Sequence, residues 1–78
     1  MENMKVDICF RTTASSEYKP AIAVRELLIQ HGVQWYGQYR GDTHYAIVSS
    51  YPVSPEVIES LRGLNLPTTA KLELYASR

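Results

Sequence analysis

A chain of 78 residues is long enough for one domain with one hydrophobic core and too short for two. Eight basic and eight acidic side chains give a formal net charge of zero, which argues against nucleic-acid binding by overall positive charge and equally against an acidic mimic of DNA. One cysteine excludes an internal disulfide framework, and no apolar run approaches the roughly 20 residues of a membrane span. We therefore expect a soluble, cytoplasmic protein that is complete as given.

Residues 5–11, KVDICFR, alternate between apolar and polar side chains over a β-rich composition, which predicts the first strand. The polar face of this strand carries Asp7, Cys9 and Arg11. A polar loop follows, and Pro20 fits the first turn of a helix because its missing N–H would have no partner there. We therefore expect a strand, a loop and then a helix.

Residues 20–31 have the composition of a helix, and Gly32 stands at the left-handed position that commonly ends one. The residues that form its core stripe at helical spacing are Ala21, Val24, Leu27 and Leu28. Ile22 and Ile29 lie outside this stripe, about 100° or more from its centre. We expect them to pack against a second helix; the alternative is that they contact a partner protein.

Residues 33–50 predict a β-hairpin, because Gly41 and Asp42 suit a two-residue type II′ turn whose twist matches that of the flanking strands. This turn fixes the register, and side chains alternate between the two faces of the hairpin. One face carries Trp35 beside small residues, as expected beneath a helix. The other face carries an apolar and tyrosine-rich set: Tyr36, Gln38, Tyr45 and Ile47.

Ser54 and Pro55 predict the N-cap and first turn of a second helix, which stops at Gly63. Residues 69–76 alternate as a last strand, with outward side chains at Lys71, Glu73 and Tyr75. The resulting order βαββαβ predicts an α+β, ferredoxin-like fold for residues 1–78. With right-handed crossovers, its four-stranded antiparallel sheet has the strand order 4-1-3-2 and both helices on one face.

Two helices on one face leave the other face of the sheet open. The predicted open face holds Gln38 and, at its centre, Cys9, Tyr36, Tyr45, Ile47 and Tyr75. Aromatic and aliphatic side chains gathered in this way have the composition of an interface core. The alternative is that the tyrosines are good strand formers whose hydroxyls stay in water. We expect a partner to bind at this face, at the flank formed by Ile22 and Ile29, or along the edge strand over residues 33–40.

Residues 44–48, HYAIV, resemble the middle of the third-strand motif of the RNA recognition motif, a family with the same topology. The resemblance covers only these residues and departs at three places. Ile47 stands at the second stacking position, Ser50 replaces the terminal aromatic, and Cys9 stands where a first-strand aromatic would stack on a base. It implies binding of single-stranded RNA with Tyr45 as the stacking platform. RNA binding is therefore the alternative hypothesis.

The sequence lacks the patterns of phosphate-binding enzymes and of the metal carriers with this fold. The loop TTASSE has neither the glycines nor the lysine that a phosphate-binding loop needs. Metal carriers of this fold use a Cys-x-x-Cys pair, whereas Cys9 is alone, and His31 and His44 are too far apart in the pattern to share a site. Asp7, on the same face, disfavours a reactive Cys9 thiolate. We expect no enzyme activity, no cofactor and no metal.

The leading hypothesis is a small non-catalytic protein-binding module, either an inhibitor or adaptor of a larger complex or a homodimer. In size and solitary architecture the chain resembles small phage-encoded inhibitors of bacterial defence complexes, such as anti-CRISPR proteins. This resemblance is one of fold alone. It implies a protein partner, and we expect neither nucleic acid nor a membrane to be bound.

Overall fold

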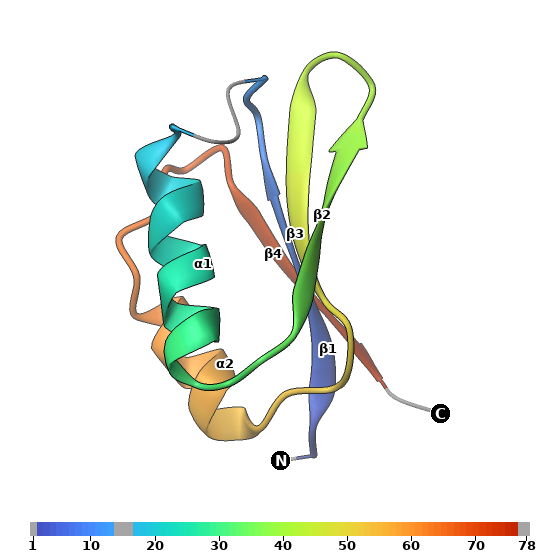
Figure 1. Cartoon of the computed structure of the whole chain (residues 1–78), viewed down its shortest axis with the longest axis vertical. Helices are drawn as coiled ribbons and strands as arrows, with labels where there is room; N and C mark the ends of the chain where they lie inside the picture. Colours follow the sequence, from blue (N-terminus) through green and yellow to red (C-terminus); the bar gives the residue numbers. More distant parts are fainter. Residues whose placement is uncertain (1, 14–16, 77–78) are drawn as a thin grey trace.

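The computed structural model describes residues 2–13 and 17–76, in which four strands form one antiparallel sheet and two helices cover one of its faces (Figure 1). The elements in chain order are β1 (Met4–Phe10), α1 (Lys19–Gln30), β2 (Trp35–Arg40), β3 (His44–Ser49), α2 (Pro55–Arg62) and β4 (Lys71–Ala76). The strands lie in the order β2-β3-β1-β4, which is the predicted order counted from the other edge. The predicted α+β class and strand order are therefore confirmed.

The hydrophobic core lies between the helices and the sheet, because each element turns its apolar side chains toward this layer. The side chains that are completely buried there include Val6, Ile8, Phe10, Val24, Leu28 and Ile58. Phe10 also meets the ring of Tyr18 edge to face, with 5.7 Å between the ring centroids. The predicted alternation of β1 and the core stripe of α1 are thus correct.

The helices begin and end close to the predicted positions. The Ser54 hydroxyl accepts a hydrogen bond from the Val57 N–H at 3.4 Å, and a proline occupies the first turn of α2. α1 starts at Lys19, one residue before the predicted start, and Gly32 beyond its end has a φ of +69°, which glycine adopts without steric cost. Neither helix in the described ranges is long and apolar enough to cross a membrane.

The predicted two-residue turn of the hairpin is wrong. Residues 41–43 connect β2 to β3, and Arg40 pairs with His44. The additional loop residue shifts β3 by one position relative to β2, and a shift of one residue moves every side chain of a strand to the opposite face. Tyr45 and Ile47 therefore face the helices instead of the open side of the sheet.

The size of the side chains explains this register. Tyr45 and Ile47 lie opposite two buried residues of β1 and help to fill the core. The predicted register would have placed the smaller Ala46 and Val48 there. Because register follows the pattern that buries the larger apolar side chains, the core selects the three-residue loop.

The predicted packing of Ile22 and Ile29 against α2 is wrong for Ile29. Its side chain is 65% exposed. Ile22 is partly buried, and neither residue belongs to the hydrophobic cluster of the core. Contact with a partner protein, the alternative for this flank of α1, stays a prediction.

Candidate functional site

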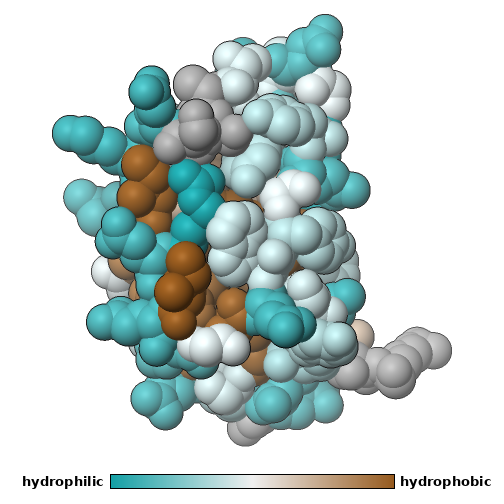
Figure 2. Space-filling view, in the orientation of Figure 1, coloured by the Kyte–Doolittle hydropathy of each residue, from teal (hydrophilic) through white to brown (hydrophobic). Residues whose placement is uncertain are grey.

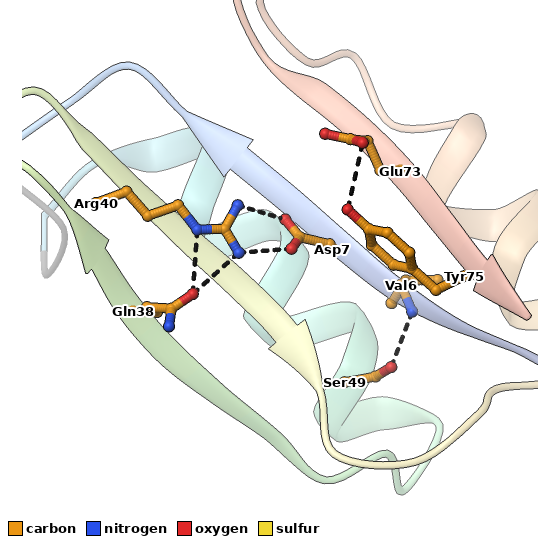
Figure 3. Close-up of polar contacts among 7 residues, drawn as sticks. All are labelled: Val6, Asp7, Gln38, Arg40, Ser49, Glu73 and Tyr75. Atoms are coloured by element: carbon orange, nitrogen blue, oxygen red, sulfur yellow. Dashed lines mark hydrogen bonds and ion pairs between the residues drawn. The ribbon is translucent and has the colours of Figure 1, made fainter. Parts of the chain in front are cut away.

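An ion pair crosses the open face of the sheet from β2 to β1. The Arg40 guanidinium donates two hydrogen bonds to the Asp7 carboxylate, from Nη1 to Oδ1 at 3.0 Å and from Nη2 to Oδ2 at 2.5 Å (Figure 3). The side-chain carbonyl of Gln38 accepts two more hydrogen bonds from the same guanidinium, at 3.1 and 3.0 Å. Because β3 lies between β2 and β1, the Arg40 side chain passes over β3 to reach its partner.

Small residues of β3 lie beneath this ion pair. Ala46 and Val48 are 0% and 7% exposed, although the helices cover the opposite face of the sheet. Ala46 pairs with Gln38 on one side and with Cys9 on the other, so it sits directly under the polar side chains that join β2 to β1. The centre of the open face is therefore closed by the chain's own side chains.

The carboxylates of Asp7 and Glu73 shift the pKa values of two neighbouring side chains on the open face. The hydrogen bond to Asp7 raises the pKa of Arg40 above its usual value. On β4, the Tyr75 hydroxyl donates a hydrogen bond to Glu73 Oε2 at 3.3 Å, and the negative charge of Glu73 raises the pKa of Tyr75. Asp7 and Glu73 lie directly opposite each other in β1 and β4, so the guanidinium also offsets the repulsion between two carboxylates.

The residues predicted to form one tyrosine-rich patch are separated. Tyr36 and Tyr75 are 46% and 48% exposed, but they belong to β2 and β4, at opposite edges of the sheet. Tyr45 and Ile47 are 8% and 0% exposed in the core, so their predicted place on the open face is wrong. The open face therefore presents two isolated tyrosines on either side of an ion pair.

The other predicted site residues are likewise divided between the open face and the helix-covered face of the sheet. Cys9 lies partly buried on the open face, as expected from its strand, and Gln38 is engaged by Arg40. The stacking platform predicted at Tyr45 is also wrong, because its ring lies on the helix-covered side, 5.2 Å from the ring of Tyr39. Base stacking on this residue would require opening the core.

The described part of the chain has hollows at two places, among others. One of about 220 Å³ on the open face is lined by Cys9, Arg40, His44, Thr69, Lys71 and Glu73, and its guanidinium is already paired with Asp7. A larger one of about 490 Å³ lies where the chain leaves α1 and enters α2, lined by residues 31–34, residues 51–54 and Val57. No cluster of three or more His, Cys, Asp or Glu side chains suited to a metal occurs among residues 2–13 and 17–76.

The strongest candidate surface is the exposed edge of β2, together with the flank of α1 beside it. The Arg25 guanidinium of α1 lies over the Trp35 ring, 5.9 Å from its centroid, so this flank of α1 faces β2. Ile22 and Ile29 are three residues before and four residues after Arg25, and therefore share its flank. The exposed Ile29 and the partly buried Ile22 thus lie on the flank of α1 that faces β2.

We define the β2 edge surface by five residues on the helix side of this edge: Ile22, Ile29, Trp35, Gly37 and Tyr39. Figure 2 shows hydrophobic residues in brown over α1 and paler residues over β2 beside them. Tyr39 is 63% exposed, Ile29 is 65% exposed, and Trp35 is partly buried. The surface is therefore apolar and aromatic apart from the Arg25 guanidinium over Trp35, and it runs along a strand rather than over a sheet face.

The backbone of β2 offers hydrogen-bonding groups to this surface. The Ser50 N–H donates to the Gln34 carbonyl at 2.9 Å, and hydrogen-bonded pairs alternate with non-bonded pairs along an antiparallel ladder. The bonded pairs of β2 and β3 are therefore those at even-numbered positions of β2. The backbone N–H and C=O groups of Trp35 and Gly37 consequently point away from β3, toward the edge of the sheet.

Gly37 lies on the face of Trp35, as predicted, but its close contact with Tyr45 was not predicted. A Cβ built on Gly37 would lie 2.7 Å from Cζ and 2.8 Å from Cε1 of Tyr45, closer than such atoms approach in proteins. The Tyr45 ring therefore lies over the glycine and can stay buried at an otherwise uncovered part of the sheet. A glycine inside a strand pattern is the signal for such close contact, and it was present in the sequence.

Comparison of the chain with models of protein families, with curated proteins and with solved structures found no match.

Proposed function

We propose that this chain is a non-catalytic protein-binding module of ferredoxin-like fold, and that it binds an extended strand of a partner protein along the β2 edge surface. Addition of a strand to a sheet edge draws its affinity from main-chain hydrogen bonds and its specificity from the side chains beside the edge. Outward-pointing main-chain groups and exposed side chains are both available along β2.

The observation that carries this proposal is the absence of protection on β2. Natural sheet edges are guarded against pairing by Lys, by other inward-pointing charges, by Pro or by a very short strand. β2 has six residues, WYGQYR, and its one charged side chain, Arg40, is held over the open face by Asp7. The opposite edge, β4, carries charges at Lys71 and Glu73. Of the two edges, β2 is thus the one suited to pairing.

The exposed side chains beside β2 support the same proposal. Aromatic residues dominate the energetics of protein interfaces, and loss of one such anchor commonly costs about 2 kcal/mol or more of binding free energy. Tyr39 and Ile29 expose most of their side chains on the helix side of the edge, and Tyr36 is exposed on the open side. An incoming strand would therefore gain apolar contacts on both of its faces.

Affinity capture with matched variants tests the proposal. The wild-type chain, Tyr39→Lys and Tyr75→Lys are each immobilised and exposed to an extract of the cells that produce the chain, to which a differently tagged copy of the chain is added. We expect Tyr39→Lys to lose the captured proteins, because it places a charge on the β2 edge. The control, Tyr75→Lys, makes the same replacement at an exposed tyrosine of β4 and should retain them. The proposal would be contradicted if only Tyr75→Lys lost the captured proteins, or if both variants retained them.

A further inference from the structure

We infer that the strand bound at the β2 edge surface is β2 of a second copy of this chain, paired antiparallel about a two-fold axis through Gly37. The inference rests on the proposed function and names its partner. It follows from the backbone alternation of β2, from the side chains that this alternation aligns, and from the flank of α1 above them.

The backbone of β2 restricts how two copies can pair. In an antiparallel pair, an outward-pointing residue of one strand must lie opposite an outward-pointing residue of the other. The outward-pointing positions of β2 are the odd-numbered ones, so two copies can be centred on residue 36, 37 or 38. Only the arrangement centred on Gly37 matches residues 35–39 of one copy with residues 35–39 of the other. Within the strand it pairs three outward-pointing residues of each copy, whereas the arrangements centred on residues 36 and 38 pair only two.

The same arrangement is complementary in its side chains. Trp35 lies opposite the second copy's Tyr39 on the helix side, and Tyr36 lies opposite the second copy's Gln38 on the open side. Gly37 meets itself on the axis, where any larger side chain would meet its own copy. No charged residue of one strand faces a charged residue of the other within residues 35–39. Aromatic pairs across strands and the lack of opposed like charges both favour this pairing.

The helix flank adds the area that strand pairing alone does not provide. A two-fold axis perpendicular to the sheet keeps the helices of both copies on the same side, so the α1 flank of each copy, with Ile22, Arg25 and Ile29, faces the shared edge. One whole face of a molecule measuring 33 × 23 × 21 Å spans on the order of 700 Å², so burial of the ~800 Å² that each partner buries in a standard interface would need this entire side of the molecule and not the strand edge alone. A stable dimer would therefore use the β2 strand and the α1 flank together.

Single cysteines on the open side distinguish the possible registers. In the arrangement centred on Gly37, positions 36 and 38 of the two copies face each other as a non-bonded pair, about 4.5 Å apart between Cα atoms, within reach of a disulfide. Tyr36→Cys and Gln38→Cys are prepared separately in a Cys9→Ala background, with different tags, then oxidised alone and mixed. Tyr75→Cys in the same background is the control on the other edge.

We expect a disulfide between the two different variants in the mixture and little in either variant alone. A disulfide formed by Tyr36→Cys alone would indicate a centre at residue 36, and one formed by Gln38→Cys alone a centre at residue 38. Either result overturns the two-fold axis at Gly37. Cross-linking of Tyr75→Cys as efficient as that of the mixture would show that the edges pair without selectivity and overturns the inference too.

Sedimentation of the unmodified chain over a range of concentrations separates this inference from the proposed function. We expect a dimer, with a dissociation constant raised at least about tenfold by Tyr39→Lys and unchanged by Tyr75→Lys. A chain that stays monomeric at ~1 mM would overturn the second copy as partner. If Tyr39→Lys at the same time loses the capture of another protein, the edge binds a different strand and the proposed function stands.

Discussion

At the scale of single residues, Gly37 shows how the core and the exposed edge depend on each other. The Tyr45 ring is buried because it lies over a residue without a side chain. We expect Gly37→Ala to lower the free energy of unfolding by about 1–3 kcal/mol, because the new methyl group collides with a buried ring. Gly63→Ala is the matched control. Its Cβ would lie 3.4 Å from the Ser60 carbonyl oxygen, an ordinary contact distance, and its φ is −77°, so the change should cost nothing or stabilise slightly. Urea denaturation measures both variants, and equal effects would contradict this role of Gly37.

The ion pair on the open face predicts an asymmetry between its two partners. The Asp7 side chain is 8% exposed and that of Arg40 is 36% exposed. Arg40→Met should therefore cost about 2–3 kcal/mol of stability, because it leaves a buried carboxylate without its guanidinium. Asp7→Val should cost less, since the freed arginine can turn into water, and the double variant should recover most of the loss. Chemical denaturation of all three decides this, and equal costs for the two single variants would contradict it.

Tyr75 supplies a prediction about pH. The negative charge of Glu73 raises the pKa of the Tyr75 phenol because it disfavours the phenolate. Glu73→Gln removes this charge and should lower the pKa of Tyr75 toward its ordinary value, about 10. NMR titration of the ring carbon bonded to oxygen measures the shift. A pKa that rises or stays the same in Glu73→Gln would mean that another group perturbs the phenol.

At the scale of elements, periodicity predicted which segments form helices and strands but not the phase of one strand. β1 and α1 each have one strongly apolar side, so their buried faces followed from the pattern. β3 is apolar on both sides, since Tyr45, Ala46, Ile47 and Val48 are all buried. Alternation therefore carries no information there, and the turn chemistry of Gly41 favoured a loop one residue too short. The phase was decided by packing against β1, which the hairpin sequence alone does not contain.

At one end of the β1–β3 ladder, just beyond the pair of Asp7 and Val48, a side chain takes the place of a backbone acceptor. The Val6 N–H donates to Ser49 Oγ at 2.9 Å, and Ser49 is completely buried (Figure 3). Ser49→Ala should cost about 1–3 kcal/mol of unfolding free energy, because it leaves a buried N–H without an acceptor. Ser60→Ala removes an exposed hydrogen bond within α2 and should change stability by about 0.5 kcal/mol or less. Thermal or chemical denaturation compares the two, and a Ser49→Ala variant as stable as the control would contradict this role.

At the scale of the whole molecule, the two edges of the sheet differ in their protection against pairing with another strand. The sequence predicted an open face as the binding surface, but Arg40 and Asp7 close the centre of that face and its two tyrosines lie at opposite edges. The edge strand and the flank of α1 were predicted only as alternatives. Their placement beside each other could not be read from the sequence, because it depends on how α1 lies over the sheet, which the contact between Arg25 and Trp35 reveals.

Amide hydrogen exchange of β2 tests the account most directly. In the isolated chain, the N–H groups of Trp35 and Gly37 point away from β3, so we expect them to exchange quickly, while that of Gln38, at a bonded position, exchanges slowly. When a strand binds at the edge, whether from a second copy at high concentration or from a captured partner, the exchange at Trp35 and Gly37 should slow by at least about tenfold. If complexes form while these two amides keep their fast exchange, or if protection appears along β4 instead, the β2 edge is not the binding surface.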